Sequence, residues 1–182
     1  MNSPLQQATD NANERMRRVR LMSFDVDGVM TDGTLYFLDS GEEMKAFNVL
    51  DGHGIKMLQE AGVRTAIFTA RQSPAVERRA KNLGIEFLHQ GVENKRVALE
   101  QLIASLGLEY ADCGYIGDDV IDLPVLRRVG FAASVPNGAA IVQSHVHYVT
   151  KASGGRGAVR EVCERILAAQ GKLDAALARY LQ

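Results

Sequence analysis

The sequence has few cysteines and no long apolar run. Cys113 and Cys163 are its two cysteines, and they stand far apart, so they suggest neither a disulfide framework nor a thiolate metal site. No apolar stretch approaches the roughly 20 residues that cross a bilayer. The first twenty residues carry charged side chains where a secretory signal has an apolar block. We therefore expect a cytoplasmic protein without a membrane partner.

The sequence also lacks an excess of charge of either sign. Its 21 basic and 22 acidic residues leave a formal net charge of −1, whereas a nucleic-acid-binding protein usually has a basic excess or a basic face. We therefore expect no nucleic-acid partner. A length of 182 residues suits one domain with a substantial core. We predict a single domain over residues 1–182, with an N-terminal extension over 1–18, a hairpin insert over 32–50, and a C-terminal tail and helix over 151–182.

Strand-like apolar runs alternate with helical patterns along the whole chain. Strands are predicted over residues 21–24, 63–69, 85–88, 113–116, 131–135 and 147–150. Helices are predicted over residues 12–18, 51–62, 73–84, 94–106, 123–129 and 139–144, and again around residues 159–167. Such alternation predicts a doubly wound parallel α/β sheet, a Rossmann-like fold. Asp51 is the predicted N-cap of the helix that it opens.

The insert over residues 32–50 is too short to be a second domain. Apolar and aromatic residues on both sides of Asp39-Ser40-Gly41 predict a β-hairpin at the mouth of the sheet. Its side chains Leu35, Phe37 and Phe47 suit either a contact between subunits or ordinary packing.

Two acidic residues end the first predicted strand. Asp25 and Asp27 follow residues 21–24 directly, and Gly28 behind them permits a sharp turn. Both carboxylates then lie at the carboxyl end of a strand, where open α/β sheets bind their ligands. Like charges so close need a cation or a shared proton, and a divalent metal bound through oxygen meets that need. Taken alone, the same residues could equally be turn formers after a buried strand.

Polar residues also follow the later strands. They are Thr69 and Arg71 after the second strand, Lys95 at the start of a helix, and Asp118, Asp119 and Asp122 after the fourth strand. Because parallel strands open their carboxyl ends on one edge, we expect these side chains in one crevice. Phosphoryl transfer uses such a set: a carboxylate as nucleophile, a magnesium ion that screens the phosphate, a second carboxyl group that moves a proton, and a lysine that pairs with a phosphate oxygen.

Four motifs resemble those of the haloacid-dehalogenase-like hydrolases. They are D-V-D-G-V-M-T-D, F-T-A-R, Lys95 and G-D-D-x-x-D, and the resemblance spans residues 21–133. Three further stretches look like the 3-deoxy-D-manno-octulosonate 8-phosphate phosphatases of that superfamily: D-G-T-L-Y, residues 47–55, and G-G-R-G-A-V-R-E in the tail. The resemblance implies a haloacid-dehalogenase-like fold without a large cap domain, Mg²⁺ as cofactor, a sugar-acid phosphate as small-molecule substrate, a role in lipopolysaccharide precursor synthesis, and a homotetramer.

The resemblance also implies roles for the acidic residues, position by position. Asp25 would be the nucleophile, and Asp27 the general acid and base. The metal would be held by Asp25, the main-chain carbonyl of Asp27, and Asp118. Asp119 and Asp122 would support that metal shell, although Asp122 could instead cap the helix that follows it.

The remaining motif residues would bind the phosphate group. The resemblance implies that Thr69 binds the transferring phosphoryl group, that Lys95 neutralises it, and that Arg71 reaches the phosphate or the sugar carboxylate. Lys95 would stand at the helix end that disfavours a cation, which favours a role for it. Relatives often have glycine at the position of Ala70, so an additional methyl group would lie beside the backbone contact at that position.

Several further residues each allow two interpretations. The gaps that hold a large cap in many such hydrolases are short here, so the site would be open unless a neighbouring subunit closes it. The Gly-rich tail around Arg156 could be a lid whose arginine meets an anionic sugar, or a flexible connection to the last helix. His53 could contact substrate or be a hydrated loop residue. His145 and His147 are spaced like residues on one face of a strand, but no third metal ligand stands nearby in sequence.

Three other functions share parts of this pattern. A phosphatase for a related nine-carbon sugar-acid phosphate would share every strand-end motif. A receiver-type signalling module also places carboxylates, threonine and lysine at the ends of parallel strands, but its phospho-acceptor follows a separate acidic pair and its chain is shorter. The intact set of Asp25, Asp27, Lys95 and Asp118 disfavours a non-catalytic scaffold.

Overall fold

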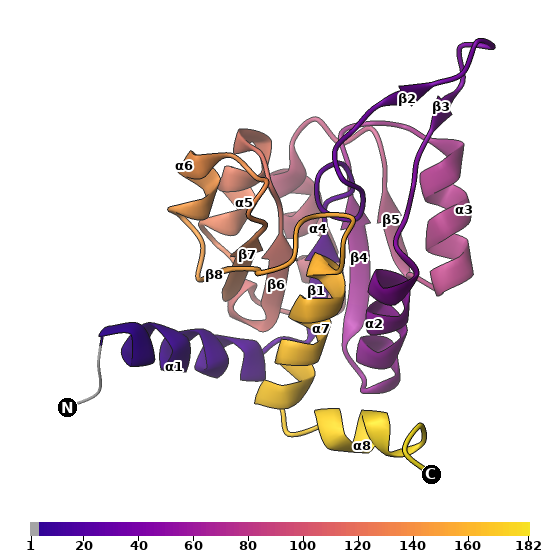
Figure 1. The fold of residues 1–182 in the computed structure, drawn as a ribbon. Coiled ribbons are helices and arrows are strands. Elements are labelled where there is room, and N and C mark those ends of the chain that lie inside the picture. Colours follow the sequence, from indigo (N-terminus) through magenta and orange to yellow (C-terminus); the bar gives the residue numbers. More distant parts are fainter. Residues whose placement is uncertain (1–3) are drawn as a thin grey trace.

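The computed structural model describes residues 4–182 and contains a central sheet with helices on both faces (Figure 1). The strands of the sheet are β1 (Leu21–Phe24), β4 (Arg64–Phe68), β5 (Phe87–His89), β6 (Cys113–Ile116), β7 (Phe131–Ser134) and β8 (Tyr148–Val149). The helices are α1 (Pro4–Arg17), α2 (Val49–Glu60), α3 (Pro74–Leu83), α4 (Lys95–Leu106), α5 (Leu123–Leu126), α6 (Ala140–Gln143), α7 (Ala158–Ala169) and α8 (Leu173–Ala178).

All neighbouring strands of the sheet are parallel, in the order β5-β4-β1-β6-β7-β8. Chain order reverses between β1 and β6, which makes the carboxyl ends of these two strands the switch point where doubly wound sheets bind ligands. Phe24 of β1 pairs with both Ile67 of β4 and Ile116 of β6, so the three strands end level with one another. The predicted doubly wound parallel sheet is confirmed.

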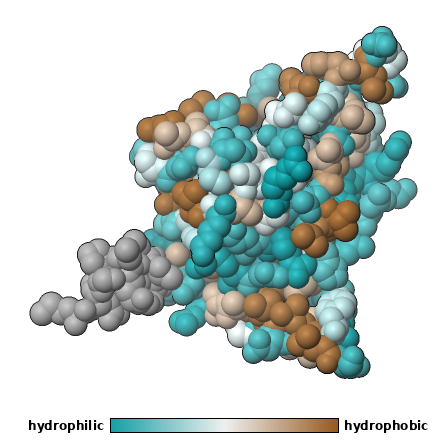
Figure 2. All heavy atoms as spheres, viewed as in Figure 1, coloured by the Kyte–Doolittle hydropathy of each residue, from teal (hydrophilic) through white to brown (hydrophobic). Residues whose placement is uncertain are grey.

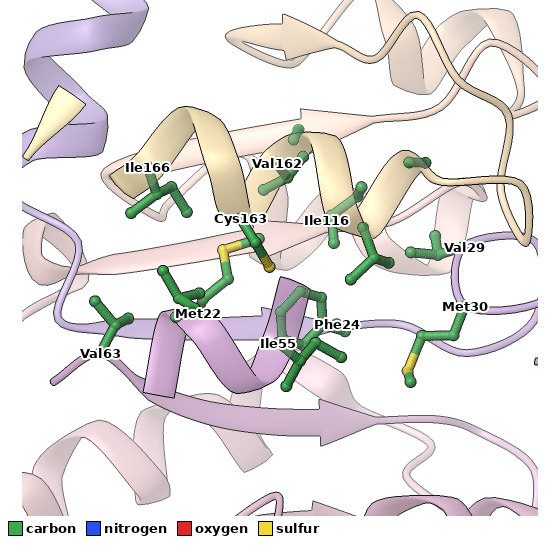
Figure 3. Packing of buried hydrophobic residues seen from close by; sticks show 14 of the residues in the cluster. Met22, Phe24, Val29, Met30, Ile55, Val63, Ile116, Val162, Cys163 and Ile166 are labelled. Carbon is green, nitrogen blue, oxygen red and sulfur yellow. The ribbon is translucent and has the colours of Figure 1, made fainter. Parts of the chain in front are cut away.

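Alternate residues of the central strand face opposite sides of the sheet. Met22 and Phe24 lie in the core formed with α1, α2, α3 and α7, whereas Leu21 lies in the core formed with α4 and α5. This is the two-residue period of a strand, and full burial on both faces explains why the strand is apolar. Figure 3 shows Met22 and Phe24 between Cys163 of α7 and Ile55 of α2.

Helices α2 and α7 pack with their backbones close together. A Cβ atom built on Gly54 would lie 2.9 Å from the Cα of Arg160, so only glycine fits without a shift. Gly54, one of the two glycines that flank His53, therefore permits the close packing of α2 against α7.

The prediction that Asp51 caps its own helix is wrong. Asn48 is the N-cap of α2, and its side chain accepts a hydrogen bond from the backbone N–H of Leu50. Asp51 lies in the first turn of α2, is buried, and accepts hydrogen bonds from Gly157 (3.3 Å) and Arg160 (2.8 Å) at the start of α7. The carboxylate thus satisfies the free N–H groups of a different helix, with which its charge also interacts favourably.

The two ends of the chain are more helical than predicted. Helix α1 begins at Pro4, well before the expected start at residue 12, and Met16 on it is fully buried in the core. Residues 1–3 of the predicted extension lie outside the described part of the chain. Helix α8 follows α7 and was not predicted. Within residues 4–182, no helix is both long enough and apolar enough to span a bilayer.

The predicted hairpin is present. Strands β2 (Tyr36–Phe37) and β3 (Glu43–Met44) pair in an antiparallel manner and form a separate two-stranded ribbon. Figure 1 shows this ribbon projecting from the carboxyl edge of the sheet, above α2 and α3. The insert therefore stands beside the strand ends at which the predicted catalytic residues lie.

Candidate active site

The carboxyl ends of β1, β4 and β6 open into one pocket of about 230 Å³. Its lining residues are Asp25, Asp27, Gly33, Thr69, Ala70, Arg71, Asp118, Asp119 and Ile121. The structure therefore brings together the acidic residues, the threonine and the arginine that the sequence placed at three strand ends. The level ends of the strands account for this convergence, because each polar residue lies within three positions of the end of its strand.

The loop after β1 makes the sharp turn expected from its glycine. Gly28 has φ 87°, a conformation that favours glycine. A Cβ atom at this position would also lie 2.1 Å from a carboxylate oxygen of Asp118. Gly28 therefore permits both the turn and the close approach of the β1 and β6 loops.

Lys95 supplies the buried positive charge of the site. Its side chain is 2% exposed, and its Nζ lies 2.7 Å from Asp25 Oδ1 and 2.6 Å from Asp122 Oδ1. Burial disfavours the charged ammonium, but the two carboxylates outweigh that effect and raise the pKa of Lys95. The same two contacts offset its unfavourable place at the N-terminus of α4.

Asp122 is fully buried, and both of its carboxylate oxygens are already hydrogen-bonded. Oδ1 accepts from Lys95 and from the hydroxyl of Tyr115 (2.8 Å), and Oδ2 accepts from the backbone N–H groups of Asp118 (3.1 Å) and Asp119 (3.3 Å). Asp122 occupies the N-cap position of α5, but its side chain makes no capping hydrogen bond to that helix. Asp122 instead holds the β6 loop and Lys95 in place.

The acidic cluster suits a divalent cation. One carboxylate oxygen from each of Asp25, Asp118 and Asp122 lies within 4.8 Å of the other two. Oδ1 of Asp118 is buried without a hydrogen-bond partner among the described residues. Both oxygens of Asp122, in contrast, already accept two hydrogen bonds each. Asp25 and Asp118 are therefore the carboxylates that would hold a cation, and oxygen donors of this kind match the preference of Mg²⁺.

Asp25 and Asp118, the two candidate metal ligands, both have a pKa that is raised above the ordinary value of an aspartate. Burial, followed by the charge of Asp122, raises the pKa of Asp118 to about 6. The same two causes raise the pKa of Asp25 well above its ordinary value, although Lys95 opposes the shift. Two carboxyl groups in this position cannot both carry charge at low cost without a cation between them.

Thr69 and Arg71 shape the β4 side of the pocket. Thr69 is 2% exposed, its N–H donates to the carbonyl of His89 (3.0 Å), and its Oγ1 accepts from the N–H of Arg71 (3.2 Å). The guanidinium of Arg71 donates to Glu43 of the hairpin and remains half exposed at the pocket. A hydroxyl and a cation thus face the space where a phosphate ester would lie.

Glu43 and Lys45 of the hairpin, which belong to none of the sequence motifs, also reach the site. Lys45 donates a hydrogen bond to Asp27 and also lies beside Glu43, which in turn accepts from Arg71. The alternation of Glu43, Met44 and Lys45 indicates that the two charged side chains lie on the same side of the strand, because residues two apart on a strand point to the same side.

The Gly-rich tail lies on the β1 loop of its own chain. The N–H of Gly155 donates to the carbonyl of Val29 (2.9 Å), which places the tail against the loop that follows Asp25 and Asp27. Arg156 forms an ion pair with Asp32 at 3.8 Å and keeps 73% of its side chain exposed. The backbone of this segment is therefore held in place, while the arginine is available to an anion.

The histidines do not join the acidic cluster. His53 does not line the pocket and instead contacts the ring of Tyr180 edge-on, with 5.4 Å between centroids. Nδ1 of His147 accepts from the N–H of Ala132 (2.8 Å), whereas His145 is exposed and lies 2.8 Å from the carbonyl of Ile141. The metal site considered for His145 and His147 is therefore not formed in the described part of the chain.

Known proteins resemble this chain in sequence and in structure. A family model of the haloacid dehalogenase-like hydrolases matches residues 50–130. A 3-deoxy-D-manno-octulosonate 8-phosphate phosphatase of Yersinia pestis is 47% identical over 92% of this chain and 89% of its own length. A crystal structure of a probable YrbI family phosphatase from Pseudomonas syringae has a TM-score of 0.94 at 54% identity, and covers 95% of this chain and 98% of its own.

A third relative was solved with ligands. The 3-deoxy-D-manno-octulosonate 8-phosphate phosphatase of Moraxella catarrhalis, in complex with a magnesium ion, a phosphate ion and 3-deoxy-D-manno-octulosonate (KDO), has a TM-score of 0.93 at 44% identity. The match covers 94% of this chain and 98% of that one. The similarity therefore extends over nearly all of both chains.

Because the pKa of Asp118 is raised, we expect cation binding at this carboxylate to depend on pH. Protons and a cation compete for the same oxygens, and a pKa of about 6 places that competition just below neutrality. We expect saturating Mg²⁺ to stabilise the protein by about 2–3 kcal/mol near pH 7.5, and by far less near pH 5. Thermal unfolding with and without Mg²⁺ at both pH values measures this.

The control for this experiment is the metal-free protein. Because the folded pKa of Asp118 is raised above its ordinary 3.8, the folded state binds more protons between the two values, and the contribution of Asp118 to stability falls as the pH rises. Asp118→Asn should respond weakly to Mg²⁺ at both pH values. Equal stabilisation of the wild type at both would contradict the assignment.

Proposed function

The chain belongs to the 3-deoxy-D-manno-octulosonate 8-phosphate phosphatases, a family of haloacid dehalogenase-like hydrolases, and on that premise we propose that it hydrolyses this eight-carbon sugar-acid phosphate with Mg²⁺. The products are the free sugar acid and phosphate, and the reaction serves lipopolysaccharide precursor synthesis in the cytoplasm. The observation that carries the proposal is the pairing of Asp25 with Lys95, beside a carboxylate oxygen of Asp118 that has no hydrogen-bond partner within residues 4–182. That arrangement offers a nucleophile, a fixed cation and a metal ligand at one point.

The proposed reaction has two steps. An oxygen of Asp25 attacks phosphorus, and the bond to the sugar oxygen breaks while Asp27 gives that oxygen a proton. Asp27 then takes a proton from water, which attacks phosphorus and releases phosphate from Asp25. Mg²⁺, held by Asp25, Asp118 and the main-chain carbonyl of Asp27, would screen the negative charges that must approach one another.

Other residues would bind rather than react. Lys95 neutralises the nucleophile and phosphate oxygens with its buried ammonium, and the hydroxyl of Thr69 donates to the phosphoryl group. Arg71 and Arg156 supply the exposed guanidinium groups that suit the carboxylate of a sugar acid. His53 has no assigned place in this mechanism, because its side chain contacts Tyr180.

Replacing the nucleophile tests the mechanism directly. Asp25→Asn preserves the shape of the side chain but removes its nucleophilic oxygen anion, so we expect phosphate release to fall by roughly a thousandfold or more. Lys95 keeps Asp122 as its partner in this variant, so the folded state should persist. Steady-state phosphate release, with circular dichroism to check folding, measures both.

The matched control is Asp39→Asn, which changes an exposed aspartate in the hairpin turn. It should turn over like the wild type. Normal turnover by Asp25→Asn would show that another group attacks phosphorus.

Substrate choice is tested with a panel of sugar phosphates in the presence of Mg²⁺. We expect the highest kcat/KM for the eight-carbon 3-deoxy-octulosonate 8-phosphate, because the relatives that span nearly all of this chain carry that substrate in their names. A higher value for a nine-carbon sugar-acid phosphate would favour the sibling activity. A single turnover on every ester, including an aryl phosphate, would favour a receiver module instead.

We also propose that the chain forms a homotetramer through its hairpin. The hairpin exposes apolar side chains that a monomer usually keeps few of: Leu35 (43%), Phe37 (66%), Leu38 (49%) and Met44 (49%). Figure 2 shows brown and tan atoms at the upper right, where the hairpin projects in Figure 1. A neighbouring subunit at this place would also cover a pocket that has no large cap.

Sedimentation of the purified protein tests the assembly. We expect a tetramer for the wild type and smaller species for Phe37→Asp, because a charge would then be buried in an apolar interface. Glu42→Gln, an exposed change on the same hairpin, should leave the mass unchanged. A wild-type monomer at micromolar concentration would rule the proposal out.

A further inference from the structure

The hairpin carries a lysine that is buried far more deeply than its position on an exposed ribbon suggests. The side chain of Lys45 is 3% exposed, whereas its strand neighbour Met44 is 49% exposed. Lysine is almost never buried without a partner, because an isolated ammonium in the interior is costly. The place of Lys45 therefore depends on the two carboxylates that it contacts.

Those carboxylates come from different parts of the chain. Lys45 donates a hydrogen bond to Oδ1 of Asp27 on the β1 loop. Its Nζ also lies 2.6 Å from Oε1 of Glu43, an ion pair outside hydrogen-bond geometry. The other oxygen of Glu43 accepts from the guanidinium of Arg71. Arg71, Glu43, Lys45 and Asp27 thus form one continuous chain of charges from the β4 loop, through the hairpin, to the β1 loop.

This chain of charges restrains one oxygen of Asp27 and leaves the other available. Among the side chains that the structure describes, no donor contacts Oδ2 of Asp27, and the carboxylate is 26% exposed at the pocket. A carboxyl group that moves a proton needs one oxygen aimed at the reacting atom and a fixed orientation. The contact with Lys45 provides that orientation from outside the strand-end motifs.

We propose that Lys45 is the positioning residue for Asp27, with Glu43 as the brace that holds Lys45. When Asp27 gives its proton to the departing oxygen, the carboxylate that forms gains a negative charge next to an ammonium that is already in place. The hairpin is then a part of the catalytic machinery, and its position sets the geometry of proton transfer. This inference rests on the proposed phosphatase activity.

The dependence on the leaving group separates positioning of the acid from a general structural role. A sugar alkoxide is strongly basic and needs a proton as it departs, whereas nitrophenolate departs readily without one. In single-turnover experiments we expect Lys45→Met to slow release of the sugar by about tenfold to a hundredfold and release of nitrophenol from nitrophenyl phosphate by less than about threefold. Methionine retains the apolar stem of the lysine and lacks its charge.

Two further variants accompany this comparison. Glu43→Gln should produce a smaller loss with the same preference for the sugar substrate, and it tests the proposal if Lys45→Met does not fold. Glu42→Gln, which changes an exposed hairpin carboxylate, should match the wild type on both substrates.

The outcomes distinguish this inference from the proposed function. Failure of the wild type to turn over either ester would overturn the phosphatase assignment itself. With an active wild type, equal losses on both substrates would show that Lys45 only supports the fold, and unchanged rates on both would show that Asp27 is positioned without it. A raised KM with unchanged release rates would make Lys45 a binding residue, and would also overturn the proposal.

Discussion

The balance of buried charge between the β1 and β6 loops is the constraint on which the rest of the site depends. Asp25, Asp118 and Asp122 bring three carboxyl groups together, and Lys95 contacts two of them from the start of α4. Removing one member of such a buried set costs more than the set contributes as a whole, because an uncompensated charge is left behind. The charges therefore hold one another in place and fix the three segments that carry them, which are the β1 loop, the β6 loop and the start of α4.

The three carboxylates differ in how many hydrogen-bond partners they have. The two with fewer partners form the reactive site. Asp122 uses both oxygens on Lys95, Tyr115 and two backbone N–H groups. Asp25 and Asp118 keep oxygens that face the pocket. Full satisfaction at one carboxylate makes the network rigid, and incomplete satisfaction at the other two makes a cation and a phosphate favourable there.

The β1 loop is also the place where distant parts of the chain meet. The hairpin reaches it through Lys45, and the tail reaches it through Gly154, where a Cβ atom would lie 1.7 Å from the carbonyl oxygen of Gly28. Asn137 joins them, because its side chain donates to that carbonyl (3.2 Å) and accepts from the N–H of Gly154 (2.8 Å). A loop braced from three sides presents its carboxylates already oriented, which reduces the entropic cost of reaching the reactive geometry.

The strands and the polar residues at their ends could be predicted from the sequence alone, because an apolar run followed by Asp-x-Asp-Gly or Gly-Asp-Asp is a local signal. The partners of individual side chains could not be predicted in this way: Asp51 accepts a hydrogen bond from a residue 109 positions away, and alternation along the hairpin does not indicate that Lys45 contacts Asp27. His53 likewise contacts Tyr180 near the far end of the chain. Local sequence encodes backbone conformation through sterics and periodicity, but a charged or polar side chain finds its partner only when packing brings two segments together.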